Sequence, residues 1–233
     1  MAMMIDMHVK RRVLAGNRQF QLDVAIRTGV RRIALVGPSG AGKTLTVQSI
    51  AGLLRPDSGH IRVNESTLYD SGHAVCLVPQ QRRVAYLQQD YGLFPHLTVA
   101  QNIGFGLRKG WFNLRRNALP QSARHWVEAF ELDAVLDSYP AEISGGQKQR
   151  AALARALVVE PRMLLLDEPL AALDAGLRKK MRAELASLQA RLDIPTVLIT
   201  HDPDDALALA DQVYEIENGS IVGHCRMAPD SPA

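Results

Sequence analysis

The sequence predicts an α/β fold with a mostly parallel sheet, an antiparallel flank and a helical insert. Three continuous apolar runs have the length and composition of buried parallel strands, at residues 32–36, 163–166 and 196–200. Apolar and polar residues alternate over residues 5–30 and 59–63, as in antiparallel strands with one exposed face. Residues 90–155 contain several helical stretches and no convincing strand. Strands that alternate with helices predict a sheet with a parallel core.

The helices expected around this sheet follow from the spacing of apolar residues. A helical run over residues 44–54 comes soon after the first apolar strand. A later amphipathic helix has apolar residues at spacings of three and four: Leu177, Met181, Leu185, Leu188 and Leu192. One helix of the insert places four apolar residues on one face: Ala123, Trp126, Val127 and Phe130. We interpret residues 1–233 as one domain, with an α/β core of about 1–89 and 156–226 and a helical insert of about 90–155.

The composition is typical of a soluble globular protein. The chain has 233 residues, of which 47% are hydrophobic and 22% are charged. A chain of this length buries roughly 70–75% of its unfolded surface, so its core needs no disulfide or metal ion. The two cysteines indicate no disulfide framework and fit a reducing compartment. The net charge of +3 favours anionic partners only weakly, and leaves nucleotides, nucleic acid and anionic membranes open.

The sequence contains no recognisable membrane-spanning or secretory segment. No stretch approaches the roughly 18 apolar residues that a transmembrane helix requires. The first residues, MAMMIDMHVKRR, include an acid and lack an apolar run after the basic residues, unlike a secretory signal. We therefore expect a cytoplasmic protein, in which any membrane role depends on a partner. The final residues, MAPDSPA, are expected to fray.

A glycine-rich loop joins the first apolar strand to the helix that follows it. The letters GPSGAGKT match the phosphate-loop pattern G-x-x-x-x-G-K-[ST] and correspond to Gly37, Pro38, Ser39, Gly40, Ala41, Gly42, Lys43 and Thr44. The glycines leave backbone N–H groups free to face phosphates, and the helix N-terminus adds its positive dipole. We expect Lys43 to reach the β- and γ-phosphates and Thr44 to bind Mg²⁺. The alternative, a glycine-rich turn with an accidental lysine, does not explain the flanking strand and helix.

Two carboxylates follow the apolar run at residues 163–166. Asp167 stands at the tip of a buried strand, where a carboxylate is costly unless it meets a cation. It fits a direct or indirect Mg²⁺ ligand of a phosphate-loop ATPase. Glu168 is then placed to orient or deprotonate the attacking water. The alternative for Glu168 is a carboxylate that caps the next helix, because Pro169 suits a helix start.

Polar residues also follow two further predicted strands. Gln89 comes after residues 84–87 (VAYL), and His201 comes directly after residues 196–200. Lone residues of these types usually lie on the surface. Open α/β sheets, however, bind ligands at the carboxyl ends of their strands. Gln89 and His201 are therefore candidate site residues.

A second glycine-rich motif, ISGGQ at residues 143–147, precedes another helix-forming run. Together with the other motifs it resembles the nucleotide-binding subunit of an ATP-binding cassette (ABC) transporter. The matching segments span nearly the whole chain in the family's order: residues 37–44, Gln89, 143–147, LLLDEP at 164–169, AALD at 171–174 and His201. The ISGGQ motif upstream of LLLDEP is the most specific part of this match.

The resemblance implies the ABC ATPase fold and a site that binds ATP and Mg²⁺. It implies that the metal is held by Thr44, Gln89 and Asp167, and that the catalytic residues are Lys43, Gln89, Glu168 and His201. It also implies a head-to-tail dimer of two copies, in which each ISGGQ motif covers the ATP held by the other copy's phosphate loop. The residues that bind in trans are then Ser144, Gly145, Gly146 and Gln147, and Asp174 lies in the contact between subunits.

Within this family, two segments resemble import ATPases, at residues 82–107 and 200–206 (THDPDDA). Residues 76–99 are most similar to molybdate-uptake ATPases, and next to those for sulfate, iron and polyamines. The implied partners are integral membrane permease subunits, a second copy of the chain and, indirectly, a solute-binding protein outside the membrane. No nucleic acid is expected. The implied location is the cytoplasmic face of the cell membrane, as a peripheral subunit.

The sequence departs from the family pattern in several places. The aromatic residue that usually stacks on adenine is missing around residues 13–17, and Phe20 is not an evident substitute. Ala171 stands where the family usually has serine. The chain ends before a C-terminal regulatory domain could form, so we expect none. Residues 108–120, with four basic and two aromatic residues, form either a solvated loop or a contact with lipid or a membrane partner.

Two other functions remain open from the sequence. A soluble cassette ATPase acting on DNA or ribosomes usually has a long coiled-coil insertion or two cassettes, and neither occurs in these residues. The second alternative is an export or lipoprotein-release ATPase. The resemblance of residues 82–107 to import ATPases argues against this alternative.

Overall fold

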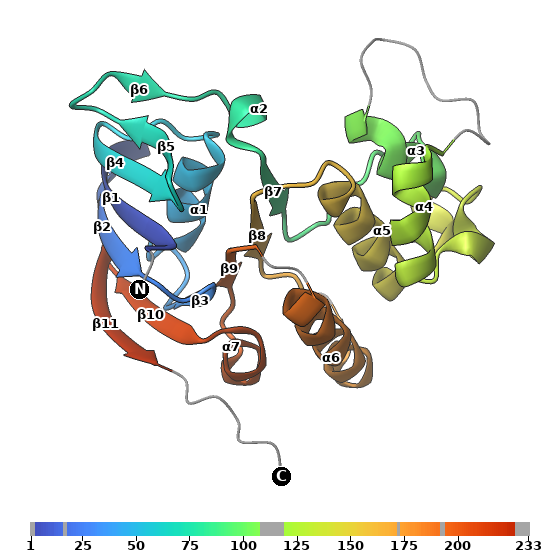
Figure 1. The fold of residues 1–233 in the computed structure, drawn as a ribbon. Helices are drawn as coiled ribbons and strands as arrows, with labels where there is room; N and C mark the ends of the chain where they lie inside the picture. Colours follow the sequence, from blue (N-terminus) through green and yellow to red (C-terminus); the bar gives the residue numbers. More distant parts are fainter. Residues whose placement is uncertain (1–2, 16–17, 108–118, 172, 192–193, 227–233) are drawn as a thin grey trace.

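A computed structural model describes residues 3–15, 18–107, 119–171, 173–191 and 194–226. Its strands form one 11-stranded sheet with the order β6-β5-β4-β1-β2-β11-β10-β3-β9-β8-β7 (Figure 1). The strands are β1 (Ile5–Ala15), β2 (Arg18–Thr28), β3 (Arg32–Val36), β4 (Ser58–Val63), β5 (Ser66–Asp70), β6 (Val75–Cys76), β7 (Val84–Leu87), β8 (Met163–Asp167), β9 (Thr196–Ile199), β10 (Gln212–Glu217) and β11 (Ser220–Arg226). The predicted α/β class is confirmed.

The sheet has a parallel part and an antiparallel part. Strands β10, β3, β9, β8 and β7 pair in parallel, and β1 pairs antiparallel with both β2 and β4. The parallel pairing places the carboxyl ends of β3, β7, β8 and β9 on the same edge. This edge is where the sequence places its candidate residues.

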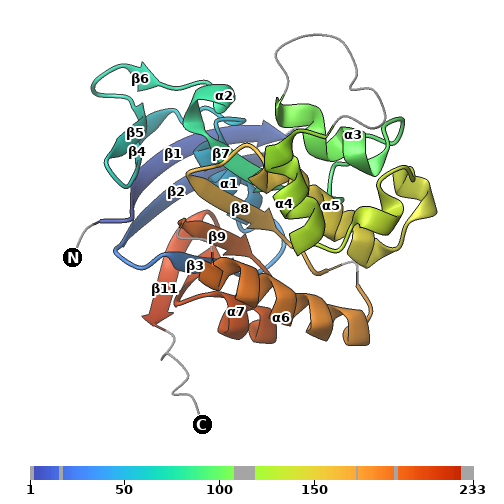
Figure 2. The ribbon, with the colours of Figure 1, turned by 45° about the vertical axis from the view of Figure 1, so that its right-hand side comes forward.

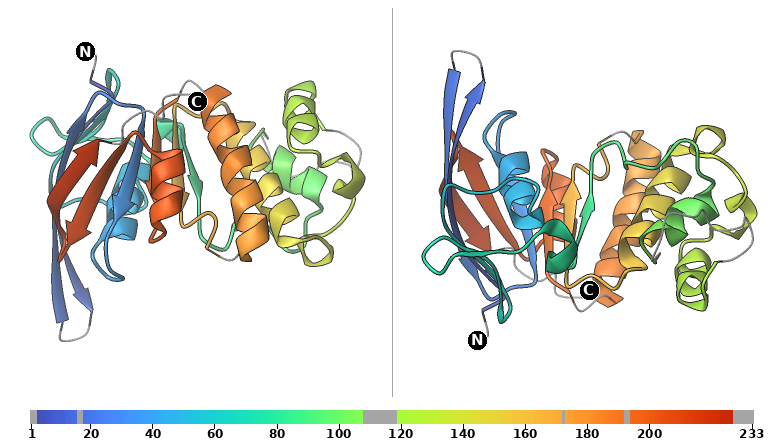
Figure 3. Two further views of the ribbon diagram at one scale, coloured as in Figure 1. Left: turned by 90° about the horizontal axis from the view of Figure 1, so that it is seen from below. Right: turned by 90° about the horizontal axis from the view of Figure 1, so that it is seen from above.

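The α-helices are α1 (Lys43–Ala51), α2 (Pro79–Arg82), α3 (Val99–Ile103), α4 (Gln121–Ala129), α5 (Gly145–Leu157), α6 (Ala175–Arg191) and α7 (Pro203–Leu209). The part of the chain that the structure describes also contains the short 3₁₀ helices η1 (Gly104–Leu107), η2 (Asp133–Val135) and η3 (Pro140–Glu142). Helix α1 lies between the antiparallel flank and the parallel strands, where it contacts β2, β7, β8 and β9 (Figure 3). Helices α3, α4 and α5 pack together at the other end of the molecule (Figure 1).

The continuous apolar runs arise because the central strands are covered on both faces. In β8, Leu164 and Leu166 pack in a core shared with α5 and α6, whereas Met163 and Leu165 pack in a core shared with α1. Each face therefore needs apolar side chains, and the period of two that marks a half-exposed strand disappears. The long strands β1 and β2 have one buried face and keep the alternation.

The predicted amphipathic helices are also confirmed within the described residues. Met181, Leu185 and Leu188 of α6 are buried and Leu177 is partly buried against the same core; Leu192 lies outside the described residues. The four apolar residues predicted on one face of the insert helix all contact this core. Residues 108–118 and the tail at 227–233 also lie outside the described residues.

Several features differ from the prediction, including strands β5 and β6, which the sequence pattern does not predict. The helix predicted over residues 44–54 ends at Ala51, because Gly52 adopts a left-handed conformation with φ 82 and its N–H bonds the last carbonyls of α1. Strands β10 and β11 have no counterpart among the predicted elements. Only three residues of β10 and none of β11 are buried, so they lack the continuous apolar signal of the central strands.

Among the described residues, no helix combines the length and apolar character needed to cross a bilayer.

Candidate functional site

The phosphate-loop residues 37–42 connect the end of β3 to the start of α1. Gly37 has φ 143, and a Cβ atom there would lie 2.1 Å from the carbonyl oxygen of Ile216 in β10. Only glycine fits this close approach of two backbone segments. The loop is thus built against the sheet itself; Pro38, Ser39 and Gly40 are exposed, whereas Ala41 and Gly42 are buried at the start of α1.

Lys43 is the first residue of α1 and is buried. Its Nζ donates to the carbonyl oxygens of Gly37 and Pro38, at 2.7 and 2.9 Å. Among the described residues, no carboxylate lies within ion-pair distance of this ammonium group. A buried cation surrounded by neutral carbonyls and a helix N-terminus makes this a favourable place for an anion.

Asp167, the last residue of β8, lies beside this loop. Its Oδ2 accepts a hydrogen bond from the Tyr86 hydroxyl at 2.9 Å. Burial raises the pKa of Asp167, while hydrogen bonds from Tyr86 and Thr44 act in the opposite direction. A buried carboxylate next to a threonine hydroxyl presents the oxygen ligands that Mg²⁺ prefers. Tyr86 was missed by sequence reasoning, because a tyrosine within an apolar strand gives no signal of its partner.

Glu168 follows Asp167 with a strained backbone, at φ 47. This conformation is uncommon for residues other than glycine and clusters at functional sites. The Glu168 N–H donates to the carbonyl oxygen of Ile199 at 3.0 Å, which fastens it to the end of β9. Its Oε2 lies 3.4 Å from Nδ1 of His201.

The predicted residues of the phosphate site converge on one pocket of about 420 Å³. It is lined by Val13, Phe20, Gly37, Ser39, Gly40, Gly42, Lys43, Thr44, Leu45, Gln89, Asp167, Glu168 and His201. The loop residues Pro38 and Ala41 are not among its lining residues. The structure therefore brings together six polar side chains that stand at four separate positions in the sequence: Lys43, Thr44, Gln89, Asp167, Glu168 and His201.

Phe20 also lines this pocket, although no pattern in the sequence places it there. It pairs with Val13 across the β1–β2 hairpin, and its ring lies so close to Gly42 that a Cβ atom there would be 3.2 Å from Cζ. Residues 13–17 lack the expected aromatic residue, but Phe20 on the adjacent strand lies beside Val13. Strand pairing, which no local pattern reveals, brings Phe20 to the site.

The ISGGQ motif does not line the pocket that the phosphate loop forms. Ser144 is the N-cap of α5 and is exposed: its Oγ accepts from the Gln147 N–H at 3.3 Å, and its own N–H donates to Gln147 Oε1 at 2.9 Å. Gly145 and Gly146 begin the helix itself. This motif thus presents an exposed, capped helix N-terminus outside the phosphate-loop pocket.

Asp174 lies near the ISGGQ motif rather than near the phosphate loop. Its carboxylate caps α6 by accepting from the N–H groups of Gly176 and Leu177 at 3.1 and 3.0 Å. A Cβ atom on Gly146 would lie 3.4 Å from Leu177, so the first turns of α5 and α6 are in close contact. The structure therefore groups the candidate residues into two separate clusters.

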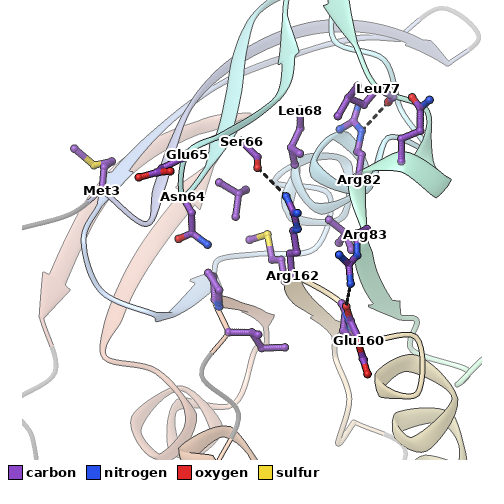
Figure 4. A pocket seen from close by; sticks show the side chains of 17 residues that line it. Met3, Asn64, Glu65, Ser66, Leu68, Leu77, Arg82, Arg83, Glu160 and Arg162 are labelled. Atoms are coloured by element: carbon purple, nitrogen blue, oxygen red, sulfur yellow. Dashed lines mark hydrogen bonds between the residues drawn. The ribbon is translucent and has the colours of Figure 1, made fainter. Parts of the chain in front are cut away.

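Another cavity, of about 900 Å³, lies at the amino ends of β7 and β8 (Figure 4). Its arginines are already engaged: Arg162 donates to Ser66 Oγ at 3.1 Å, and Arg83 donates to the carbonyl oxygen of Glu160 at 2.9 Å. The buried Arg82 donates to the carbonyl of Ser49 at the C-terminal end of α1. None of the predicted site residues lines this cavity, so size alone does not identify the functional site.

Comparisons with known proteins agree with these motifs. The chain is 41% identical over 214 residues to the molybdenum import ATP-binding protein ModC of Rhodospirillum rubrum, covering 90% of this chain and 55% of that protein. It is 41% identical to the molybdate/tungstate import ATP-binding protein WtpC of Archaeoglobus fulgidus, covering 87% and 80%. The Fe(3+) ions import ATP-binding protein FbpC of Pseudomonas fluorescens is 46% identical, covering 82% and 52%. Apart from WtpC, the chain spans a little over half the length of these relatives.

A solved structure has the same fold at low sequence identity. It is a dimeric ATP-binding cassette bound to ADP and Pi, with a TM-score of 0.78 and 23% identity, covering 97% of this chain and 100% of that one. At this identity the similarity concerns the fold alone. The family model described as ABC transporter matches residues 21–171, which is more than half of the sequence. The chain therefore belongs to the ABC transporter family.

Proposed function

We propose that this chain is the ATP-binding and ATP-hydrolysing subunit of an ABC importer, built as a single nucleotide-binding domain with a helical insert at residues 90–155. The observation that supports this best is the convergence of Lys43, Asp167 and Glu168 in the pocket at the phosphate loop. A cation, a buried carboxylate and a second, more accessible carboxylate are the groups that phosphoryl transfer to water requires.

The phosphate loop and Lys43 bind the triphosphate. The Lys43 ammonium group, held by two carbonyls, gains a charged partner when phosphate oxygens enter the loop. Thr44, Gln89 and Asp167 would hold Mg²⁺, which supplies charge neutralisation for the phosphates. Burial raises the pKa of Asp167 because it disfavours the charged carboxylate. A bound cation would offset this unfavourable burial of charge, which supports the assignment of Asp167 to Mg²⁺.

Glu168 acts as the general base in this proposal. It follows β8 directly, and the strained backbone directs its carboxylate into the pocket rather than into the sheet. A side chain that accepts a proton from water contributes about 10²–10⁴-fold to rate. His201, 3.4 Å from Glu168, is placed to contact the γ-phosphate and to hold Glu168 in position.

The ISGGQ motif serves a second copy of the chain. Its exposed helix N-terminus at Ser144, with Gly145, Gly146 and Gln147, offers N–H groups and a hydroxyl for an anion. The phosphate pocket of the same copy is lined by none of these residues. A head-to-tail dimer, with Asp174 in the contact, would place each motif over the other copy's ATP. That the ATP-binding cassette of the same fold is dimeric supports the pairing of two copies.

Permease subunits would dock where Gln89 leads into the helical insert. Phe94 and Phe105 contact each other there with ring centroids 4.4 Å apart, and Phe105 is 45% exposed. Arg155 of α5 donates to the carbonyls of Gly92 and Tyr91 at 2.7 and 3.0 Å, which joins this segment to the insert. A peripheral subunit bound to such a permease lies on the cytoplasmic face of the membrane.

The proposed cargo is molybdate or a related oxyanion, on the basis of the relatives named for molybdenum and molybdate/tungstate import. Sulfate, iron and polyamines are the alternatives, and the 46% identical relative named for iron import keeps iron in this group. Uptake of labelled molybdate, sulfate and Fe³⁺ by cells with and without the gene for this chain would decide among them. Loss of iron uptake alone would replace the oxyanion proposal.

The ATPase proposal is tested on the purified chain. Phosphate release from MgATP is expected to follow saturation kinetics and to require Mg²⁺. Lys43→Ala is the matched control, because it removes the ammonium group while leaving the glycine loop and α1 in place. A folded wild-type chain that neither binds nor hydrolyses MgATP would refute the proposed function.

A further inference from the structure

Two arginines on consecutive turns of α6 join the loops that flank the proposed active site. Helices α6 and α7 lie side by side against the parallel strands (Figure 2). Arg178 and Arg182 point from α6 towards the start of α7, where Asp202 is the N-cap and accepts from the N–H groups of Asp204 and Asp205. Asp202 follows His201 directly, so this ion-pair cluster is one residue from the proposed γ-phosphate contact.

Arg178 contacts two loops at once. Its Nη1 lies 3.1 Å from Asp202 Oδ2, in the loop that contains His201. Its Nη2 donates to the carbonyl oxygens of Ala171 and Leu173, at 3.2 and 3.4 Å, in the loop between Glu168 and Asp174. The Arg178 backbone N–H also donates to the Asp174 carbonyl oxygen at 2.8 Å. One guanidinium group therefore spans the loop after β8 and the loop after β9.

Arg182, one turn further along α6, has a different set of partners. It pairs with the buried Asp205 at 2.6 Å, with Asp204 at 3.4 Å and with Asp202 at 3.6 Å. Among the described residues, it makes no hydrogen bond to the loop at 169–174. Arg182 thus fastens α7 to α6, whereas Arg178 also reaches the loop that ends at Asp174.

We propose that Arg178 is a positioning residue that couples the subunit contact at Asp174 to His201 and Glu168. This rests on the proposed function. Its planar guanidinium has enough donors to hold a carboxylate and two carbonyls in fixed directions. When a second copy contacts the loop at Asp174, any shift of that loop is transmitted through Arg178 to Asp202 and to the adjacent His201. Hydrolysis would then proceed only when both loops are in place.

The test compares ATP hydrolysis in Arg178→Ala, Asp202→Asn and the double variant. The Asp202→Asn side chain would still cap α7, because its amide oxygen accepts the same N–H groups, but it lacks the charge that pairs with Arg178. Each single variant is expected to lower kcat by about 10–10²-fold with KM for ATP within about twofold of wild type. The double variant should be no slower than the slower single one, because both changes break the same connection.

Arg182 is the matched control. Arg182→Lys retains a cation near Asp205 and is expected to lower the thermal midpoint, with kcat per folded molecule within about threefold of wild type. Arg178→Lys should recover only part of the activity, because one ammonium group cannot hold the same three acceptors in their directions. These outcomes separate coupling from general loss of stability.

Three outcomes would overturn the inference while leaving the ATPase proposal intact. The first is a wild-type kcat in folded Arg178→Ala. The second is an additive loss in the double variant. The third is an equal loss of kcat in Arg178→Ala and Arg182→Lys. Absence of hydrolysis in the wild-type chain would instead refute the proposed function, so the two failures are distinguishable.

Discussion

At the residue scale, Lys43 and Glu168 of the pocket predict different defects. Lys43 donates to the carbonyls of Gly37 and Pro38 and is assigned to the phosphates, so Lys43→Ala should weaken ATP binding. Glu168→Gln keeps the shape of the side chain but removes the base, so hydrolysis should fall by about 10²–10⁴-fold with ATP binding retained. Equilibrium nucleotide binding and single-turnover hydrolysis measure the two effects separately. Full turnover by Glu168→Gln would show that Glu168 is not the general base.

Phe20 gives a second prediction at this scale. Because its ring lines the pocket beside Gly42, we expect it to contact the adenine base. Phe20→Ala should raise the Kd for ATP by about 10-fold, within the 1–3 kcal/mol that stacking on an aromatic side chain contributes. The affinity for inorganic triphosphate should stay unchanged, and Phe20→Tyr should bind ATP normally. Equal weakening for ATP and triphosphate would show that Phe20 supports the loop instead.

At the element scale, the turn after β5 depends on a single carboxylate. Asp70 accepts from the N–H groups of Gly72 and His73, and it pairs with Arg62 at 3.1 Å. The His73 side chain, 3.0 Å away, has the largest effect in lowering the pKa of Asp70 to about 2.

Because this pKa lies below that of the unfolded chain, Asp70 stabilises the folded state above about pH 4, and this contribution is lost as the pH falls through about 2. Asp70→Asn should therefore flatten the pH dependence of the unfolding free energy in that range. Urea unfolding at several pH values measures the slope. Identical slopes for both proteins would contradict this assignment.

Two substitutions of Ser144 separate the stability of the α5 N-terminus from its proposed role in binding phosphate. Ser144→Asp retains an N-cap acceptor and favours the helix dipole, so the thermal midpoint should not fall. Its negative charge would nevertheless repel a phosphate at that helix end, so ATP-dependent dimer formation should be lost. Ser144→Ala should instead cost about 1 kcal/mol of stability. Size-exclusion chromatography with ATP, in the Glu168→Gln background, reports the dimer; a normal dimer from Ser144→Asp would contradict the proposal.

The central elements could be predicted from the sequence because burial on both faces leaves a strong local signal, as in β8. The phosphate loop could be predicted because its residues are adjacent in the chain. The bond from Tyr86 to Asp167 and the approach of Phe20 to Gly42 could not, because each joins segments that are distant in the chain. Strand β11 pairs with its neighbour β10 across a short turn, but it was missed because neither strand has a continuous apolar run. The contacts of Arg178 could not be predicted either, because the sequence does not distinguish an arginine that bonds neighbouring loops from one that is solvated on an exposed helix face.

At the scale of the whole molecule, the proposed transporter predicts where the permease contacts this chain. Leu93 and Phe94 lie at the start of the insert, just after Gln89, and Phe94 contacts the exposed Phe105. In the assembled transporter, cysteines at Leu93 and Phe94 should crosslink to a cytoplasmic permease loop, and ATP should change the yield. Cysteines on β6, at the opposite edge of the sheet, are the control. Crosslinks from β6 alone would place the permease elsewhere.

The two clusters of candidate residues lead to a prediction about two copies. Lys43 and the phosphate loop form one cluster, and Ser144 with its helix N-terminus forms the other, outside that pocket. If each ATP site uses one cluster from each copy, a dimer contains two such sites. A defect in one cluster then damages both sites of a homodimer.

Mixing two defective variants tests this arrangement. Lys43→Ala removes the cation of the phosphate loop, and Ser144→Asp places a negative charge at the helix end where the phosphate would bind, so neither homodimer should trap ATP. In a heterodimer, one site combines both defects, while the other combines an intact loop with an intact helix end. The mixture should therefore recover one site that traps nucleotide with vanadate, in up to half of the dimers if pairing is random. Trapping is the better measurement because turnover can require both sites. If heterodimers form between folded variants and no trapping returns, Ser144 does not act on the partner's nucleotide.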